Sequence, residues 1–187
     1  MSKKNAKTEK ILDESINLLK NEGDFGLTMR KVSRLTEMSL SNLQYHYKNK
    51  DELLKAMADR YFQQCLSALE AQPVIEQTEH LYPFLIKHLV DGFEMSDMCR
   101  IFREYWAIST RNGVIEAHVQ QYYKDMVVVI EKKLAPLSKD NKSLVEATSL
   151  LISFVEGYSI TAKSLSMDLE SMAMTIEQVI LSSLGTV

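Results

Sequence analysis

Three helix-capping signals fall within residues 28–54, TMRKVSRLTEMSLSNLQYHYKNKDELL, and they leave this stretch little freedom in how it folds. Thr28, Ser39 and Asn49 each precede apolar residues at helical spacing, and their side chains can accept a hydrogen bond from a free N–H group of the first helical turn. Glu52, three residues after Asn49, completes a capping-box pattern. The stretch therefore predicts two short helices joined by a tight turn, followed by the start of a longer helix.

A further helix is expected just before this stretch. Apolar residues recur at helical spacing between residues 6 and 22, and Gly23 follows in the position that is typical of a helix C-cap. Two short helices joined by a turn, with a helix on either side, form a helix-turn-helix unit. In such a unit the second short helix enters the DNA major groove, so its outer face must carry hydrogen-bonding groups.

The apolar spacing predicts which side chains of the two short helices face inward, namely Met29, Val32, Leu35, Leu43 and Tyr47. The remaining side chains of the second short helix suit base reading, because Asn and Gln can pair with adenine, Ser can pair in either sense and Leu can contact a thymine methyl group. Side chains at the helix starts, together with an aromatic and a histidine, suit phosphates. The candidate DNA contacts are Thr28, Arg30, Leu40, Ser41, Asn42, Gln44, Tyr45, His46 and Lys50.

The charge distribution is consistent with a part that meets a polyanion. The net charge is -3, but residues 1–50 hold ten Lys and Arg against six Asp and Glu, so the other 137 residues carry a net charge of -7. Charge alone is equally compatible with an ordinary solvated surface, so the motif decides in favour of nucleic acid.

Residues 32–54, VSRLTEMSLSNLQYHYKNKDELL, resemble the DNA-binding signature of the TetR family of bacterial repressors. The resemblance extends over about residues 6–60. It implies an all-helical homodimer whose divergent C-terminal part binds a small effector. Three positions depart from the family pattern: Glu37 stands where the turn usually has Gly, Ser41 where a small residue such as Gly is usual, and Gln44 where an aromatic is common. Glu37 is expected to adopt a left-handed conformation at a cost of about 1 kcal/mol, and Gln44 to alter the operator preference.

The rest of the chain predicts helices at about 76–93, 97–110, 113–135, 141–165 and 168–184. Pro83 either kinks the first of these or marks its true start. The last two are strongly amphipathic, and in the family such a pair forms a four-helix dimer interface, with Gly157 and Ala162 allowing close approach. An intramolecular core is the alternative for the same apolar stripes. We predict an all-α fold with a helix-turn-helix DNA-binding domain at residues 1–50 and an effector-binding and dimerisation domain at residues 51–187.

The middle helices carry many aromatic and methionine side chains, which can line an adaptable apolar pocket or simply fill a core. His88, Arg103, Glu104 and Glu156 are candidate polar anchors for a ligand. The candidate effector contacts are His88, Phe102, Tyr105, Trp106, Tyr122, Tyr123, Met126, Phe154 and Tyr158.

Catalysis has no support in the sequence. The chain contains no Gly-rich phosphate loop, G-x-S-x-G, H-E-x-x-H or C-x-x-C motif, so we expect no enzyme, no cofactor and no metal site. No apolar run is long enough for a membrane span and no signal-peptide pattern follows the basic N-terminus, so a cytoplasmic location is expected.

The sequence thus predicts a cytoplasmic homodimeric repressor that binds a palindromic double-stranded DNA operator and responds to an unidentified small effector of apolar or aromatic character. Two alternatives stay open. One is a DNA-binding protein of the same fold that is controlled by a protein partner or lacks a ligand, and the other is an enzyme or carrier that uses a helical pocket.

Overall fold

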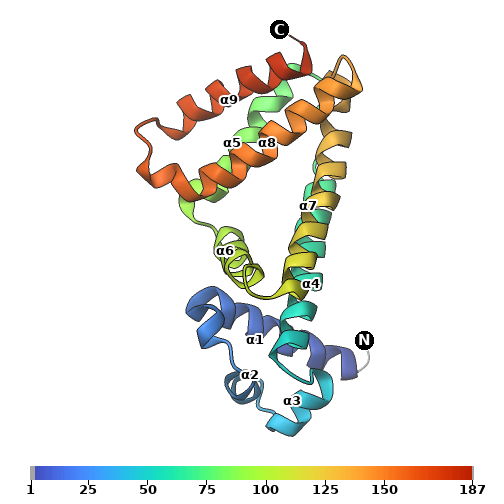
Figure 1. The fold of residues 1–187 in the computed structure, drawn as a ribbon, viewed down its shortest axis with the longest axis vertical. Helices are drawn as coiled ribbons and strands as arrows, with labels where there is room; N and C mark the ends of the chain where they lie inside the picture. Colours follow the sequence, from blue (N-terminus) through green and yellow to red (C-terminus); the bar gives the residue numbers. More distant parts are fainter. Residues whose placement is uncertain (1–2, 187) are drawn as a thin grey trace. The chain divides into compact units, whose positions relative to one another are not determined.

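The computed structural model describes residues 3–186, with side chains from residue 6, and within these residues the chain forms helices and no strand (Figure 1). The all-α fold class is confirmed. The helices are α1 (Lys3–Gly26), α2 (Met29–Leu35), α3 (Leu40–His46), α4 (Lys50–Glu70), α5 (Leu81–Glu94), α6 (Asp97–Ser109), α7 (Gly113–Leu134), α8 (Asn141–Thr161) and α9 (Leu169–Leu184), with 3-10 turns at Thr78–His80, Ala135–Leu137 and Ala162–Ser164.

The chain divides into two compact units. The first comprises residues 1–65 and 100–122, and the second comprises residues 66–99 and 123–187. The segment 100–122, which holds most of α6 and the start of α7, thus packs in the same unit as the N-terminal helices. The predicted functional boundary at residue 50 stays a prediction, because compactness does not say which residues contact a ligand or DNA.

The first unit buries one apolar face from each of its N-terminal helices. Ile11 and Leu19 of α1, Val32 of α2, Leu43 of α3 and Leu53 of α4 are each fully buried. The prediction that Leu35 faces inward is wrong, since 44% of that residue is exposed at the end of the short α2. Helix α2 has only seven residues, so a single apolar face is covered by its neighbours and its last position falls outside that face.

Two residues of the first unit, Gly23 and Glu37, have a positive φ angle. Gly23 interrupts α1 at φ 67°, a value that favours glycine, and the chain then makes one more helical turn to Gly26. The helix predicted to stop at Gly23 is therefore broken there but not ended. Glu37, in the turn between α2 and α3, has φ 58°, which confirms the expected left-handed conformation.

Aromatic side chains fill the interior of the first unit. Phe62 stacks on Phe102, with ring centroids 5.2 Å apart, and contacts Tyr105 and Tyr122 at 5.1 and 4.9 Å. Tyr105 is fully buried and its hydroxyl donates to the carbonyl of Leu54 at 3.2 Å. This cluster ties the segment 100–122 to α4.

In the second unit α5, α8 and α9 pack against one another (Figure 1). Pro83 lies in the first turn of α5, so it marks the start of the helix and does not kink it. Gly92 of α5 lies so close to α8 that an added Cβ would approach the Cα of Ser159 to 2.8 Å, which makes this glycine the point of close helix contact. Gly157 has open space around its Cα within the chain, and Ala162 lies buried in a 3-10 turn. No helix in the described part of the chain is long and apolar enough to cross a membrane.

Candidate nucleic-acid interface and C-terminal pocket

The three predicted caps are confirmed, and they set the geometry of the helix-turn-helix. Thr28 Oγ1 accepts from the N–H of Lys31 at 3.2 Å, and Ser39 Oγ accepts from the N–H of Asn42 at 3.2 Å. Asn49 Oδ1 accepts from the N–H of Glu52 at 2.9 Å. These bonds satisfy free N–H groups at the first turns of α2, α3 and α4 and fix where each helix begins.

The capping box at α4 departs from its usual form. Glu52 Oε2 accepts from the N–H of Lys48 at 3.0 Å, one residue before the cap, in place of the N–H of Asn49 itself. The bond spans the loop between α3 and α4, because Lys48 lies in that loop and Glu52 lies in the first turn of α4. It therefore holds the end of α3 and the start of α4 in a defined relation.

Helix α3 presents a polar face to solvent. Ser41, Asn42, Gln44 and Tyr45 are exposed, Leu40 and His46 are half-buried, and Leu43 is fully buried. Tyr45 is 77% exposed, which is unusual for so large an apolar ring and leaves it free for an external contact. Its ring meets that of His46 edge-on at 5.7 Å. Thr28 and Arg30 are exposed at the start of α2.

Lys50 is not a free cation. Its Nζ lies 2.8 Å from Asp24 Oδ1 and also donates to the carbonyl of Asp24. Arg111 Nη2 lies 2.9 Å from the other oxygen of the same carboxylate. Burial raises the pKa of the Asp24 carboxyl, but the hydrogen bonds and charges of Lys50 and Arg111 outweigh it and hold that pKa below its ordinary value.

Sequence reasoning missed this cluster around Asp24. The N–H of Asp24 also donates to Glu104 Oε2 at 2.9 Å, so two residues of the segment 100–122 bind the residue that follows Gly23. The partners lie 80 and 87 positions away along the chain, and no local pattern signals such a contact. Glu104, predicted as a candidate polar anchor for a ligand, instead accepts this hydrogen bond from the N–H of Asp24 within the first unit.

The sequence has a relative of known class. It is 48% identical over 186 residues, 97% of this chain and 92% of the relative, to an uncharacterised HTH-type transcriptional regulator in the dhlA 5′ region of Xanthobacter autotrophicus. The negative transcriptional regulator IcaR of the biofilm operon icaADBC of Staphylococcus epidermidis is 23% identical over 127 residues, which cover 67% of this chain and 66% of IcaR. No protein-family model matches the sequence.

Solved structures share the fold over nearly the whole chain. A TetR transcription regulator from Haloarcula marismortui has a TM-score of 0.71 at 19% identity and covers 98% of both chains. GusR of Salmonella enterica has a TM-score of 0.75 at 15% identity, over 99% of this chain and 98% of GusR. FadR of Bacillus subtilis in complex with stearoyl-CoA has a TM-score of 0.69 at 12% identity, over 94% of this chain and 98% of FadR.

The chain belongs to the TetR family of helix-turn-helix transcriptional regulators. Its relatives are regulators of transcription and not enzymes, in agreement with the sequence prediction. Within this family member, α2 and α3 are the two short helices of the helix-turn-helix.

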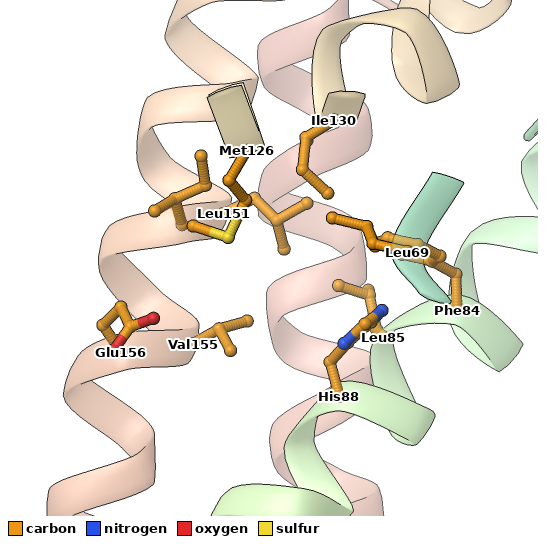
Figure 2. A pocket seen from close by; sticks show the side chains of 10 residues that line it. Leu69, Phe84, Leu85, His88, Met126, Ile130, Leu151, Val155 and Glu156 are labelled. Atoms are coloured by element: carbon orange, nitrogen blue, oxygen red, sulfur yellow. The ribbon is translucent and has the colours of Figure 1, made fainter. Parts of the chain in front are cut away.

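A pocket in the second unit of this TetR-family regulator lies between α4, α5, α7 and α8 (Figure 2). Its volume is about 60 Å³. Most of its lining is aliphatic or aromatic, and the two polar exceptions are His88 from α5 and Glu156 from α8. The lining residues are Leu69, Phe84, Leu85, His88, Met126, Ile130, Leu151, Ile152, Val155 and Glu156.

The two polar side chains of the pocket are both shifted toward their neutral forms. Burial lowers the pKa of the His88 imidazole, against the opposing charge of Asp91. Burial raises the pKa of the Glu156 carboxyl, and a hydrogen bond from Tyr123 partly offsets this effect. The Nε2 atom of His88 is buried and has no hydrogen-bond partner.

The candidate effector contacts fall into separate places. His88 and Met126 line the pocket, and Tyr123 is bound to the pocket residue Glu156. Phe154 and Tyr158 stack on each other in α8 at 5.8 Å without lining the pocket. Phe102, Tyr105 and Tyr122 belong to the aromatic cluster of the first unit, and Trp106 is 42% exposed there.

Proposed function

We propose that this protein is a homodimeric repressor that binds a palindromic operator through α3 and is released by a small ligand. The observation that carries the proposal is the polar, solvent-facing side of α3, which is held by two capped helices and a fully buried Leu43. A helix that served only the core would have no need of four exposed polar or aromatic side chains in succession around one buried leucine.

The exposed side chains divide into two groups by chemistry. Asn42 and Gln44 carry amides that can make paired hydrogen bonds to adenine, and Ser41 can donate or accept. Thr28 and Arg30, at the start of α2, and the hydroxyl of Tyr45 suit phosphate oxygens. Base contacts would specify the operator and phosphate contacts would fix the register of α3 along it.

A two-fold operator requires two copies of α3 about 34–36 Å apart, and therefore a dimer. Helices α8 and α9 support this requirement, because each carries exposed apolar side chains in addition to its buried apolar face. Ala147 and Leu151 of α8 are buried, as are Ile176 and Ile180 of α9. The exposed apolar residues on the same helices are Val145, Leu150, Ile160, Met174 and Val179. Such a surface is costly in a monomer and would be covered by the same surface of a second copy.

Ligand control would act by population shift. An effector that binds the pocket better in a conformation with mismatched α3 spacing would lower operator affinity, and a coupling of about 1–3 kcal/mol gives about 5–150-fold induction. FadR was solved with stearoyl-CoA, which supports a ligand-binding C-terminal part in a protein of this fold. IcaR is a negative regulator, which supports repression as the output.

The proposal is tested by selecting bound duplexes from a random pool at physiological salt. We expect a two-fold symmetric motif, with half-sites separated by one helical turn or a multiple of it. Enrichment of no sequence, with binding that disappears fully as salt rises, would contradict the proposal, because binding would then rest on charge alone.

A further inference from the structure

The chemistry of the pocket around His88 and Glu156 narrows the class of molecule that this pocket can hold, and the inference rests on the proposed ligand-controlled function. Eight of its ten lining residues are apolar, and among these described residues none is Lys or Arg. An anionic ligand would therefore find no positive partner in the lining and would meet the carboxyl of Glu156. Lys133, whose charge influences His88, donates its Nζ to the carbonyl of Glu70 at 3.3 Å and does not line the pocket.

The Nε2 atom of His88 has no hydrogen-bond partner in the structure, and a ligand could supply one. A buried polar atom without a hydrogen bond is costly, and Nε2 of His88 is such an atom. The ring lies against Phe84 with centroids 4.6 Å apart and lines the pocket from the α5 side (Figure 2). A half-turn of the imidazole, which has the same shape in either orientation, exchanges its nitrogen and carbon positions and can present a nitrogen to the pocket. A hydroxyl group satisfies the imidazole in either tautomer, because it can donate or accept.

The size of the pocket sets a second limit. One water molecule needs about 10–15 Å³ of volume measured in this way, so a pocket of about 60 Å³ has room for roughly five non-hydrogen atoms. Met126 is unbranched and adaptable, so the pocket can enlarge by an atom or two without disturbing the helices. This limit excludes long acyl chains and fused polycyclic dyes as fully enclosed occupants.

We propose that the pocket binds a small, uncharged, mainly apolar molecule with a single hydroxyl group, placed so that the hydroxyl meets His88 and the apolar part meets Leu85, Leu151 and Val155. Glu156 lies across the pocket from His88 on α8 and selects against acids (Figure 2). The combination favours a phenol or a short branched alcohol over a carboxylic acid of the same size.

Four one-ring probes of similar size test this on the full-length protein without DNA. They are phenol, toluene, cyclobutanecarboxylate and cyclohexylammonium, which have the same number of non-hydrogen atoms, and binding is followed at pH 7.5 through the ¹³C-methyl resonance of Met126, assigned with Met126→Leu. We expect phenol and toluene to shift this resonance saturably, and cyclobutanecarboxylate to bind at least tenfold more weakly than phenol. Tighter binding of cyclobutanecarboxylate or cyclohexylammonium than of phenol would overturn the proposal, as would the absence of any shift at Met126.

The variant His88→Leu tests the role of the imidazole. It should lower the ratio of phenol to toluene affinity about tenfold, because the hydroxyl loses its partner while the apolar contacts stay. His80→Leu is the matched control, since His80 is exposed just before α5 and does not line this pocket, and the ratio should stay unchanged. An unchanged ratio in His88→Leu would overturn the assignment of the hydroxyl to His88.

Operator binding is measured separately, so the two proposals can fail independently. If phenol binds at Met126 but does not weaken binding to the selected operator, the ligand-controlled function is contradicted and the chemistry of the pocket is supported. If the operator is bound sequence-specifically and no hydroxyl probe binds at Met126, the inference about the pocket is contradicted and DNA binding is untouched.

Discussion

Substituting Asp24 with Asn should tighten DNA binding by releasing Lys50. In the structure the Asp24 carboxylate holds Lys50 at 2.8 Å and Arg111 at 2.9 Å, and Lys50 opens α4 directly after α3 and its loop. A lysine at this position can reach a phosphate only when it is not bound to a carboxylate. Asn keeps the size of the side chain and the backbone carbonyl that accepts from Lys50, but it removes the negative charge that pairs with both cations.

The expected loss of stability follows from how exposed the two ion-pair partners of Asp24 are. The side chains of Lys50 and Arg111 are 31% and 50% exposed, so each ion pair contributes at most about 1 kcal/mol, and the variant should lose roughly 1 kcal/mol of stability, or about 2–4 °C in Tm. Each additional phosphate contact steepens the slope of log K against log salt by about 0.9, so a dimer with two released lysines should gain about 1.8.

The assay is the affinity for a selected operator between 50 and 300 mM salt, by fluorescence anisotropy. The double variant Asp24→Asn with Lys50→Met should lose the gain in slope. Asp13→Asn is the control, because Asp13 also carries an ion pair, to Arg60 at 2.7 Å, and its substitution changes the net charge equally. A steeper slope in Asp13→Asn as well, or an unchanged slope in Asp24→Asn, would refute the idea that Asp24 restrains a phosphate-binding lysine.

Asp24 also predicts an acid dependence of stability. The pKa of Asp24 is held below its ordinary value of 3.8, so the stability that this carboxylate contributes is present above that value and is lost as pH falls through the folded-state pKa. Wild type and Asp24→Asn should therefore differ in Tm at pH 7 and converge in strong acid. A constant difference at all pH values would show that the loss has another cause.

Three further predictions address the turn, the dimer and the pocket. Glu37→Gly should raise the free energy of unfolding by about 0.5–1 kcal/mol, because Glu37 sits at φ 58°, whereas Glu37→Ala keeps the strain and should give no gain in a urea titration. Leu150→Glu should yield monomers by light scattering with helix content retained, while Val128→Glu, at an exposed valine of α7, should leave the dimer intact. Glu156→Gln should be more stable than wild type at pH 7–8 and no more stable at pH 4, because the folded-state pKa of Glu156 is raised and the native state loses stability as pH rises through it; equal Tm differences at both pH values would contradict this.

Local features of this chain could be predicted from its sequence, since their causes lie within a few residues. Thr28, Ser39 and Asn49 cap helices because their side chains reach N–H groups three positions on. The left-handed conformation of Glu37 follows from the resemblance to the TetR family, in which this turn position usually holds Gly. The prediction that Leu35 faces inward is wrong, because hydrophobic periodicity indicates which face of a helix is apolar but not how far neighbouring elements cover that face.

Contacts between distant parts of the chain could not be predicted in the same way. The ion pairs of Asp24 with Lys50 and Arg111 depend on how α1, α4 and the segment 100–122 pack, and no local pattern encodes that packing. The side chains that were candidates for effector contacts show the same limit. Periodicity could not separate Phe102, Tyr105 and Tyr122, which fill the first unit, from His88 and Met126, which line the pocket.

The central claim is that α3 reads base pairs as part of a two-fold dimer, and the most direct measurement compares the sequences selected by the wild-type protein and by Gln44→Ala. The side chain of Gln44 is exposed on α3, so its removal should leave the fold intact. We predict a symmetric motif for wild type and, for the variant, relaxed preference at one pair of symmetry-related positions, with a loss of about 1–3 kcal/mol per half-site at those positions alone. An identical preference profile for both proteins, or a uniform loss of affinity for every sequence, would contradict base reading by this helix.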